Sequence, residues 1–184
     1  MPKRARAGTP DGWTIDGIRK RANQLTQADG RKQAAWQLAN EAPDARYWTA
    51  LHSFDEQYAL LYGPLGEAIT QLRADDQGDV EILVRFLEAD VYCFHSGYMK
   101  AESIRALLGA HMTSGVADRL RNVVLAVIQA YDRQEFRSYV RLARRLDSAD
   151  LRLRLRALAA SPSSATARRA GWVLAGIEGQ PATR

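Results

Sequence analysis

Apolar residues recur along the C-terminal half of the chain at the three- and four-residue spacing of amphipathic helices. The pattern is clearest over residues 115–131, where Leu120, Val124 and Ile128 fall on one helical face. We therefore expect these three residues in the core. The same spacing predicts further helices over residues 80–89, 98–110, 134–146, 149–160 and 164–178.

The N-terminal half has the same periodicity but is interrupted by helix-breaking residues. Asp29-Gly30, Pro43 and Gly63-Pro64 are typical of helix ends. The polar segment 75–79 indicates a loop, and residues 1–12 indicate a flexible basic arm. This half is predicted to form short helices over residues 14–27, 31–42, 44–53, 55–62 and 64–74.

One segment carries a conflicting signal. Residues 151–156 alternate Leu and Arg with the period of two that is typical of a strand. Leu and Arg are strong helix formers, however, and the chain offers no second strand to pair with this one. We predict a helix here, with Leu153 on the flank of its apolar face, and hence an all-α protein.

The predicted helices pair over residues 80–110, 115–146 and 149–178, at steps of about 31–35 residues, which suits a two-helix repeat. Residues 94–100 and 136–141 also resemble each other faintly. On this spacing, the segment from about 80 to 178 resembles HEAT-type helical repeat proteins. The resemblance implies an α-solenoid-like stack of antiparallel helix pairs, and an irregular helical bundle is the alternative. We expect one domain over residues 13–184, with residues 79–178 the more repeat-like half.

The amino-acid composition limits the class of protein and its expected cellular location. The 184 residues are 46% hydrophobic and 26% charged, which is ordinary for a globular domain. A single cysteine, Cys93, excludes an intramolecular disulfide. No apolar run reaches the roughly 18 residues that a membrane-spanning helix needs. We therefore expect a cytoplasmic protein without a membrane partner.

The net charge of +5 conceals a segregated pattern. Residues 33–113 carry five Lys and Arg against twelve Asp and Glu, whereas residues 114–184 carry thirteen against six. This layout suggests a basic end for an acidic partner, or a molecule that docks on itself. Of the 26 basic residues 22 are Arg, a preference that either phosphate and carboxylate recognition or GC-rich coding can produce.

No segment matches a complete catalytic, metal-binding or cofactor-binding motif. Cys93 and His95 stand two positions apart, so on a helix they would point in nearly opposite directions. The three histidines lack the spacing of a zinc site, and the acids of residues 75–90 lack the pattern of a calcium loop. Gly-rich nucleotide-binding motifs are missing as well. We predict no catalytic, cofactor or metal residues, and an enzyme is the less favoured class.

The most suggestive group is a set of arginines. Four of them share one face of the predicted helix 134–146, two lie at i and i+4 on the next helix, and Arg168-Arg169 open the last. If consecutive helices stack in parallel, these faces form one strip. The strip would suit an acidic protein or a phosphate backbone, and a solvated polar face is the third interpretation. The predicted partner-binding residues are Arg137, Arg141, Arg144, Arg145, Arg152 and Arg156.

These observations favour a non-enzymatic helical module that binds a protein partner through an extended repeat surface. A nucleic-acid-binding protein that uses the arginine strip is the alternative. A more remote form is enzymatic, because some HEAT-like proteins are DNA glycosylases. The chain resembles those only in fold class and basic charge, so no residue is assigned from them.

Overall fold

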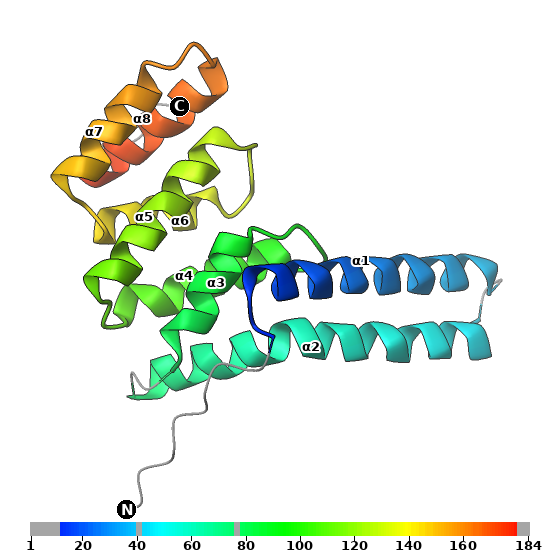
Figure 1. The fold of residues 1–184 in the computed structure, drawn as a ribbon. Coiled ribbons are helices and arrows are strands. Elements are labelled where there is room, and N and C mark those ends of the chain that lie inside the picture. Colours follow the sequence, from blue (N-terminus) through cyan, green and yellow to red (C-terminus); the bar gives the residue numbers. More distant parts are fainter. Residues whose placement is uncertain (1–11, 40–41, 76–77, 180–184) are drawn as a thin grey trace, which may run out of the picture.

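The structure is a computed structural model that describes residues 12–39, 42–75 and 78–179. Residues 1–11 of the predicted basic N-terminal segment and residues 76–77 of the predicted loop lie outside this description. Within it the chain forms α-helices and no strand, which confirms the all-α prediction (Figure 1). The eight helices are α1 (Ile15–Leu38), α2 (Ala45–Asp75), α3 (Val80–Ala89), α4 (Ser96–Gly109), α5 (Ser114–Gln129), α6 (Phe136–Arg145), α7 (Ala149–Ala159) and α8 (Ser164–Glu178).

Helix α1 runs without a break through Asp29-Gly30, so the predicted separation into helices 14–27 and 31–42 is wrong. Gly30 in a helix interior costs only about 1 kcal/mol relative to Ala. The side chain of Asp29 supports the turn that follows: it accepts from Lys32 Nζ at 2.7 Å and from Gln33 Nε2 at 2.7 Å. Local ion pairing therefore favours continuation of the helix past the glycine.

Helix α2 is likewise continuous where three helices were predicted, and Pro64 lies in its interior. Proline has no N–H, so the carbonyl of Leu60 loses its helical partner. The Leu60 side chain is half-exposed, which places this face of the helix towards water. Leu61 and Leu65 on the opposite face are fully buried and hold both halves of the helix against the core.

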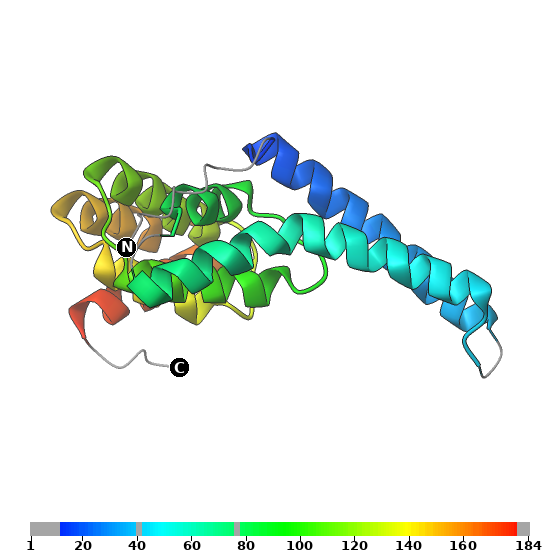
Figure 2. The same cartoon turned by 90° about the horizontal axis from the view of Figure 1, so that it is seen from below.

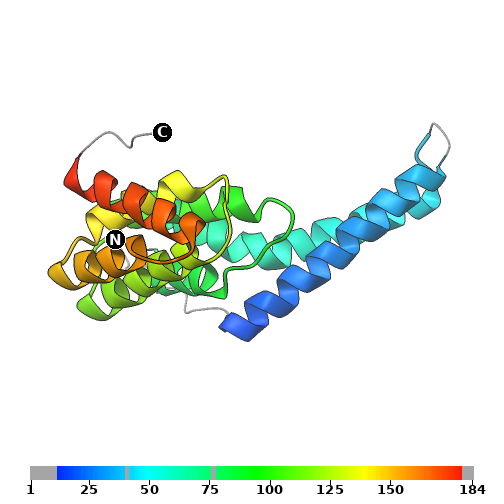
Figure 3. The same cartoon turned by 90° about the horizontal axis from the view of Figure 1, so that it is seen from above.

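Helices α1 and α2 form a long hairpin whose far half projects from the rest of the molecule (Figures 1, 2 and 3). We call this projecting hairpin the arm; it is distinct from the basic segment predicted over residues 1–12. The body consists of two rows of helices. In one row α1, α3, α5 and α7 contact in succession, and in the other α2, α4, α6 and α8 do so. The loops that join α3 to α4 and α5 to α6 therefore emerge side by side, next to the base of the arm.

The core of the body is built from the apolar faces predicted from the sequence. Leu120, Val124 and Ile128 of α5 are fully buried, as expected. The period-two segment is helical in α7, where Leu151 and Leu155 are buried.

Leu153 is two-thirds exposed, because residues at i and i+4 share a helical face and the residue between them does not.

None of the described helices combines the length and the apolar character needed to cross a lipid bilayer.

Candidate functional site

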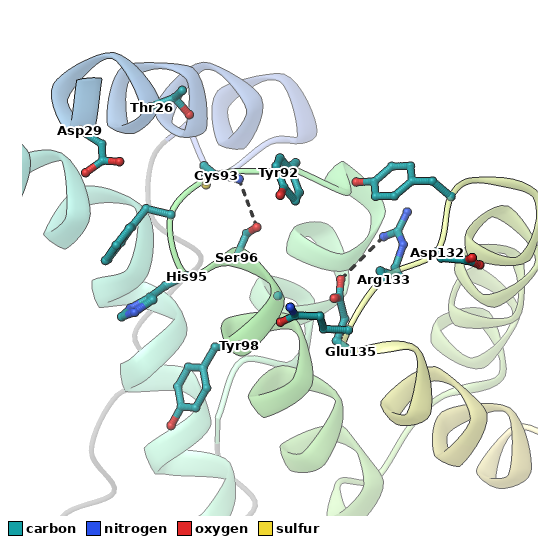
Figure 4. Close-up of a pocket in the computed structure, with 14 residues that line it drawn as sticks. Thr26, Asp29, Tyr92, Cys93, His95, Ser96, Tyr98, Asp132, Arg133 and Glu135 are labelled. Atoms are coloured by element: carbon teal, nitrogen blue, oxygen red, sulfur yellow. Dashed lines mark hydrogen bonds and ion pairs between the residues drawn. The ribbon is translucent and has the colours of Figure 1, made fainter. Parts of the chain in front are cut away.

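A cleft of about 1160 Å³ lies between the arm and the body (Figure 4). One wall comes from Thr26 and Asp29 of α1. The other walls come from residues 92–98, at the junction of α3 and α4, and residues 131–135, which precede α6. The two rows of helices thus bring together segments that lie about a hundred positions apart in the chain.

Exposed aromatic rings surround this cleft. The exposed fractions are 83% for Tyr92, 64% for Tyr98, 49% for Tyr131 and 39% for Phe94. The rings of Tyr92 and Tyr131 meet edge to face across the two loops, with their centroids 6.4 Å apart. His95 stacks on Phe94 at 4.1 Å. Large rings that remain exposed in a concave site offer apolar surface to a partner.

The backbone between α3 and α4 presents these rings by two unusual turns. Asp90 and His95 both adopt left-handed conformations, with φ of 44° and 61°. Such conformations are uncommon outside glycine and are maintained only by the surrounding structure. Ser96 Oγ accepts from the backbone N–H of Cys93 at 3.1 Å, and the Tyr62 hydroxyl donates to the Phe94 carbonyl at 2.5 Å. The loop is therefore held by side chains from α2 and α4.

Four charged side chains beneath the cleft join the two loops. Lys100 and Arg133 are almost fully buried, at 1% and 3% exposure. Asp90 accepts from Lys100 Nζ at 2.7 Å and from both terminal nitrogens of Arg133 at 2.5 and 2.9 Å. Glu135 lies 3.9 Å from each of the two bases. Two acids thus balance two buried bases, which such a desolvated cluster requires.

The ionisation of Asp90 follows from this geometry. Burial alone would raise the pKa of the Asp90 carboxyl, but hydrogen bonds from Arg133 and Lys100 outweigh it and lower the pKa below its ordinary value of 3.8. Asp90 therefore remains ionised at neutral pH and keeps both buried bases paired.

This lowered pKa predicts a loss of stability in acid. A carboxyl with a lowered folded-state pKa stabilises the fold above its unfolded value of 3.8, and that contribution disappears as the pH falls through the folded value. We expect the melting temperature of the wild type to drop below about pH 4. Thermal melts from pH 6 to 2.5 should show a smaller acid loss for Asp90→Asn, and equal losses would contradict the prediction.

Cys93 and His95 do not form a reactive pair. The Cys93 thiol lies 3.3 Å from the hydroxyl of Tyr62, whereas His95 Nδ1 lies 3.5 Å from that of Tyr58. Burial raises the pKa of the Cys93 thiol despite its hydrogen bond with Tyr62. A thiol that resists ionisation is a poor nucleophile and metal ligand. Among the described residues, no group of three His, Cys, Asp or Glu side chains could hold a metal ion.

The predicted partner-binding arginines fall on two separate surfaces. Arg137, Arg141, Arg144 and Arg145 are all exposed on α6, and within the described chain none of them has an ion-pair partner. We call these four residues the α6 arginine face. Its first member, Arg137, lies one residue after the start of α6 and two residues after Glu135, which lines the cleft.

The two arginines of α7 belong to the other row of helices. Arg152 is paired with Asp147 at 2.6 Å, and Arg156 is exposed. Helices α6 and α7 make no contact with each other in the described chain, so the continuous strip that parallel stacking of consecutive helices would give is not formed. The helices that contact α6 are α4, α5 and α8.

Of the two arginines in the second turn of α8, one is structural. Arg169 is almost completely buried and donates to the carbonyls of Ile128 and Ala130, at the C-terminal end of α5. Arg168 is half-exposed, pairs with Asp132 at 3.0 Å and lies over the Trp172 ring.

Sequence reasoning missed the aromatic rings as a group. The predicted helix 115–131 includes Tyr131, but α5 ends at Gln129 and Tyr131 lies in the following loop. The available signal was an aromatic residue just after each of two helices of the same row, α3 and α5.

Comparisons of the chain with protein-family models, with curated proteins and with solved structures found no match. Its function is therefore argued from the chemistry of the cleft and of the surface beside it.

Proposed function

We propose that this protein is a non-enzymatic binding module that receives a segment of a protein partner in the cleft between arm and body. The observation that carries the proposal is the group of exposed aromatic rings that line the cleft, led by Tyr92, Tyr98 and Tyr131, with the exposed α6 arginine face on the helix that follows the cleft's last segment. Tyrosine and arginine are enriched among the residues that dominate protein interfaces, where they combine large contact area with directed hydrogen bonds.

The arrangement of the helices supports this proposal. Successive helices of each row pack on one another, as they do in a HEAT-like stack of helix pairs, which is the architecture we propose for the body. Such stacks expose extended surfaces and place their inter-helix loops along one edge. Here that edge carries the cleft, and the charge cluster of Asp90, Lys100 and Arg133 holds its two loops together.

Site-directed photo-crosslinking tests the class of partner. A photoreactive phenylalanine analogue replaces Tyr98 at the cleft, and the matched control replaces Leu153, which is similarly exposed on α7. After irradiation in the cells that produce the protein, we expect discrete adducts from position 98 that protease removes and nuclease does not. Adducts that nuclease removes, or identical patterns from both positions, would contradict a protein partner at the cleft.

Nucleic acid is the second candidate, and the α6 arginine face is the observation that favours it. Exposed rings and unpaired arginines are also the elements of single-strand binding. In that mode nucleobases stack on aromatic rings, and phosphates pair with basic side chains of the protein. Against it, α6 and α7 make no contact with each other in the described chain, so the α6 arginine face does not continue directly onto α7.

We expect the wild type to show negligible affinity for nucleic acid at physiological salt. The measurement is an anisotropy titration with duplex and single-stranded DNA and RNA at two salt concentrations. Binding by phosphate contacts would weaken as salt rises, with a slope of roughly one per contact. A strong salt-dependent affinity that the triple variant Arg137→Glu/Arg141→Glu/Arg144→Glu loses, while remaining folded, would replace our proposal with the nucleic-acid one.

A further inference from the structure

We propose that the segment received by the cleft is acidic: an apolar anchor enters between the tyrosine rings, and carboxylates next to it pair with the α6 arginine face. This inference rests on the proposed protein-binding function and names the chemistry of the partner. It follows from which charges around the cleft are already paired and which are not.

The carboxylates of the cleft are all engaged within the protein. Asp29 binds Lys32 at 2.7 Å, and Asp132 binds Arg168 and Arg169 at 3.0 and 2.8 Å. Glu135 lies between two buried bases at 3.9 Å from each. A basic partner would have to compete with these internal pairs, so the acids of the cleft give it little to bind.

The basic side chains of the α6 arginine face, in contrast, have no ion-pair partner in the described chain. All four members of the α6 arginine face are exposed, and no described side chain pairs with them. A neutral partner that covered them would remove charged groups from water without compensation, which is unfavourable. A partner that brings carboxylates forms bidentate hydrogen bonds with the guanidinium groups instead. Charge complementarity therefore selects an acidic segment.

The geometry of α6 sets the spacing of the acids. Arg137 follows Glu135, the last residue that lines the cleft, by two positions, and at 1.5 Å per residue Arg141 and Arg145 stand about 6 and 12 Å further along the helix axis. An extended chain advances about 3.3 Å per residue, so two to four residues cover this distance. We expect the Asp or Glu residues that pair with Arg137 and with Arg141 or Arg145 to lie about two to four positions apart in the segment.

Selection from a random twelve-residue peptide display library tests this chemistry without a known partner. The full-length wild type is the bait. Two variants of equal charge change, verified by their melting temperatures, separate the surfaces. One carries Glu in place of Arg137, Arg141 and Arg144, and the control carries Glu in place of the α7 residues Arg152, Arg154 and Arg156.

We expect the selected peptides to be enriched in Asp and Glu beside an aromatic or aliphatic residue. Their affinity should fall at least tenfold on the α6 variant and less than threefold on the α7 variant. Cleft-dependent peptides that are neutral or basic, or that bind the α6 variant unchanged, would overturn the acidic assignment and leave the cleft intact as a binding site.

Two other outcomes have different meanings. Peptides displaced by a single-stranded oligonucleotide at equal concentration would show that the α6 arginine face prefers phosphate, and would overturn the acidic-peptide inference. Failure to select any peptide whose binding depends on Tyr92 and Tyr131 would overturn the proposed function itself, and the inference with it.

Discussion

Replacement of Asp90 by Asn should lower the free energy of unfolding by about 2–3 kcal/mol, because it leaves two buried bases without their principal acid at a site where Asp90 itself is partly exposed to water. Lys100 and Arg133 are buried to 1% and 3% exposure, and Glu135 alone remains near them, at 3.9 Å. Asn retains the size of Asp and its tolerance of the left-handed backbone. Urea denaturation monitored by circular dichroism measures the effect.

The matched control is an exposed ion pair. Asp150 lies 3.8 Å from Arg154 and is 70% exposed, so Asp150→Asn should change stability by no more than about 0.5 kcal/mol. If both variants unfolded at the same urea concentration as the wild type, the charge cluster would not hold the two loops of the cleft together, and the account of how the cleft is built would fail.

Replacement of Val124 by Asp should cost several kcal/mol and leave much of the protein unfolded at 25 °C. Val124 is fully buried in α5, and Leu120 and Ile128, one turn before and after it, are fully buried as well. A carboxylate in this position loses its hydration without a partner, and a domain has only about 5–15 kcal/mol of stability to lose.

Asn122→Asp provides the comparison, since it adds the same charge to the exposed side of the same helix. Asn122 Oδ1 already accepts from Arg154 at 3.0 Å, so the new carboxylate keeps a partner. We expect a change within about 0.5 kcal/mol. A wild-type melting temperature for Val124→Asp would place this face of α5 outside the core.

The apolar periodicity was sufficient to predict the helices of the body. Leu120, Val124 and Ile128 repeat every four residues and are buried, because the core face of a helix is encoded in its own sequence. The segment of alternating Leu and Arg in α7 is helical, as the helix propensity of these residues predicts. Where the residues of a single helix decide which of its faces is buried, the sequence predicts the structure.

The helix breakers of the arm were misjudged because their effect depends on surroundings. Gly30 and Pro64 each weaken a helix locally, but α1 and α2 support each other along the hairpin. Packing of Leu61 and Leu65 on the core outweighs the hydrogen bond lost at Pro64. Tertiary contacts of this kind are not visible in a single-helix pattern.

The cleft could not be predicted because it depends on pairs that are remote in sequence. Asp90 and Arg133 are 43 positions apart, and the arm contributes Asp29 from still further away. For the arginines, the four that share a face of α6 were predicted from spacing. The expected continuation onto α7 required knowledge of which helices are neighbours, and in the described chain α6 contacts α4, α5 and α8 but not α7.

A titration of cleft variants measures whether the exposed rings of the cleft bind the partner. Calorimetry compares the wild type, the double variant Tyr92→Ala/Tyr131→Ala and the control Trp48→Ala, each with a peptide selected on the wild type. Trp48 is half-exposed on the arm and lies outside the cleft. Loss of two interface rings should weaken binding by a hundredfold or so, at roughly 1–2 kcal/mol each, with the melting temperature unchanged. Unchanged affinity in the double variant, or an equal loss in Trp48→Ala, would contradict the account.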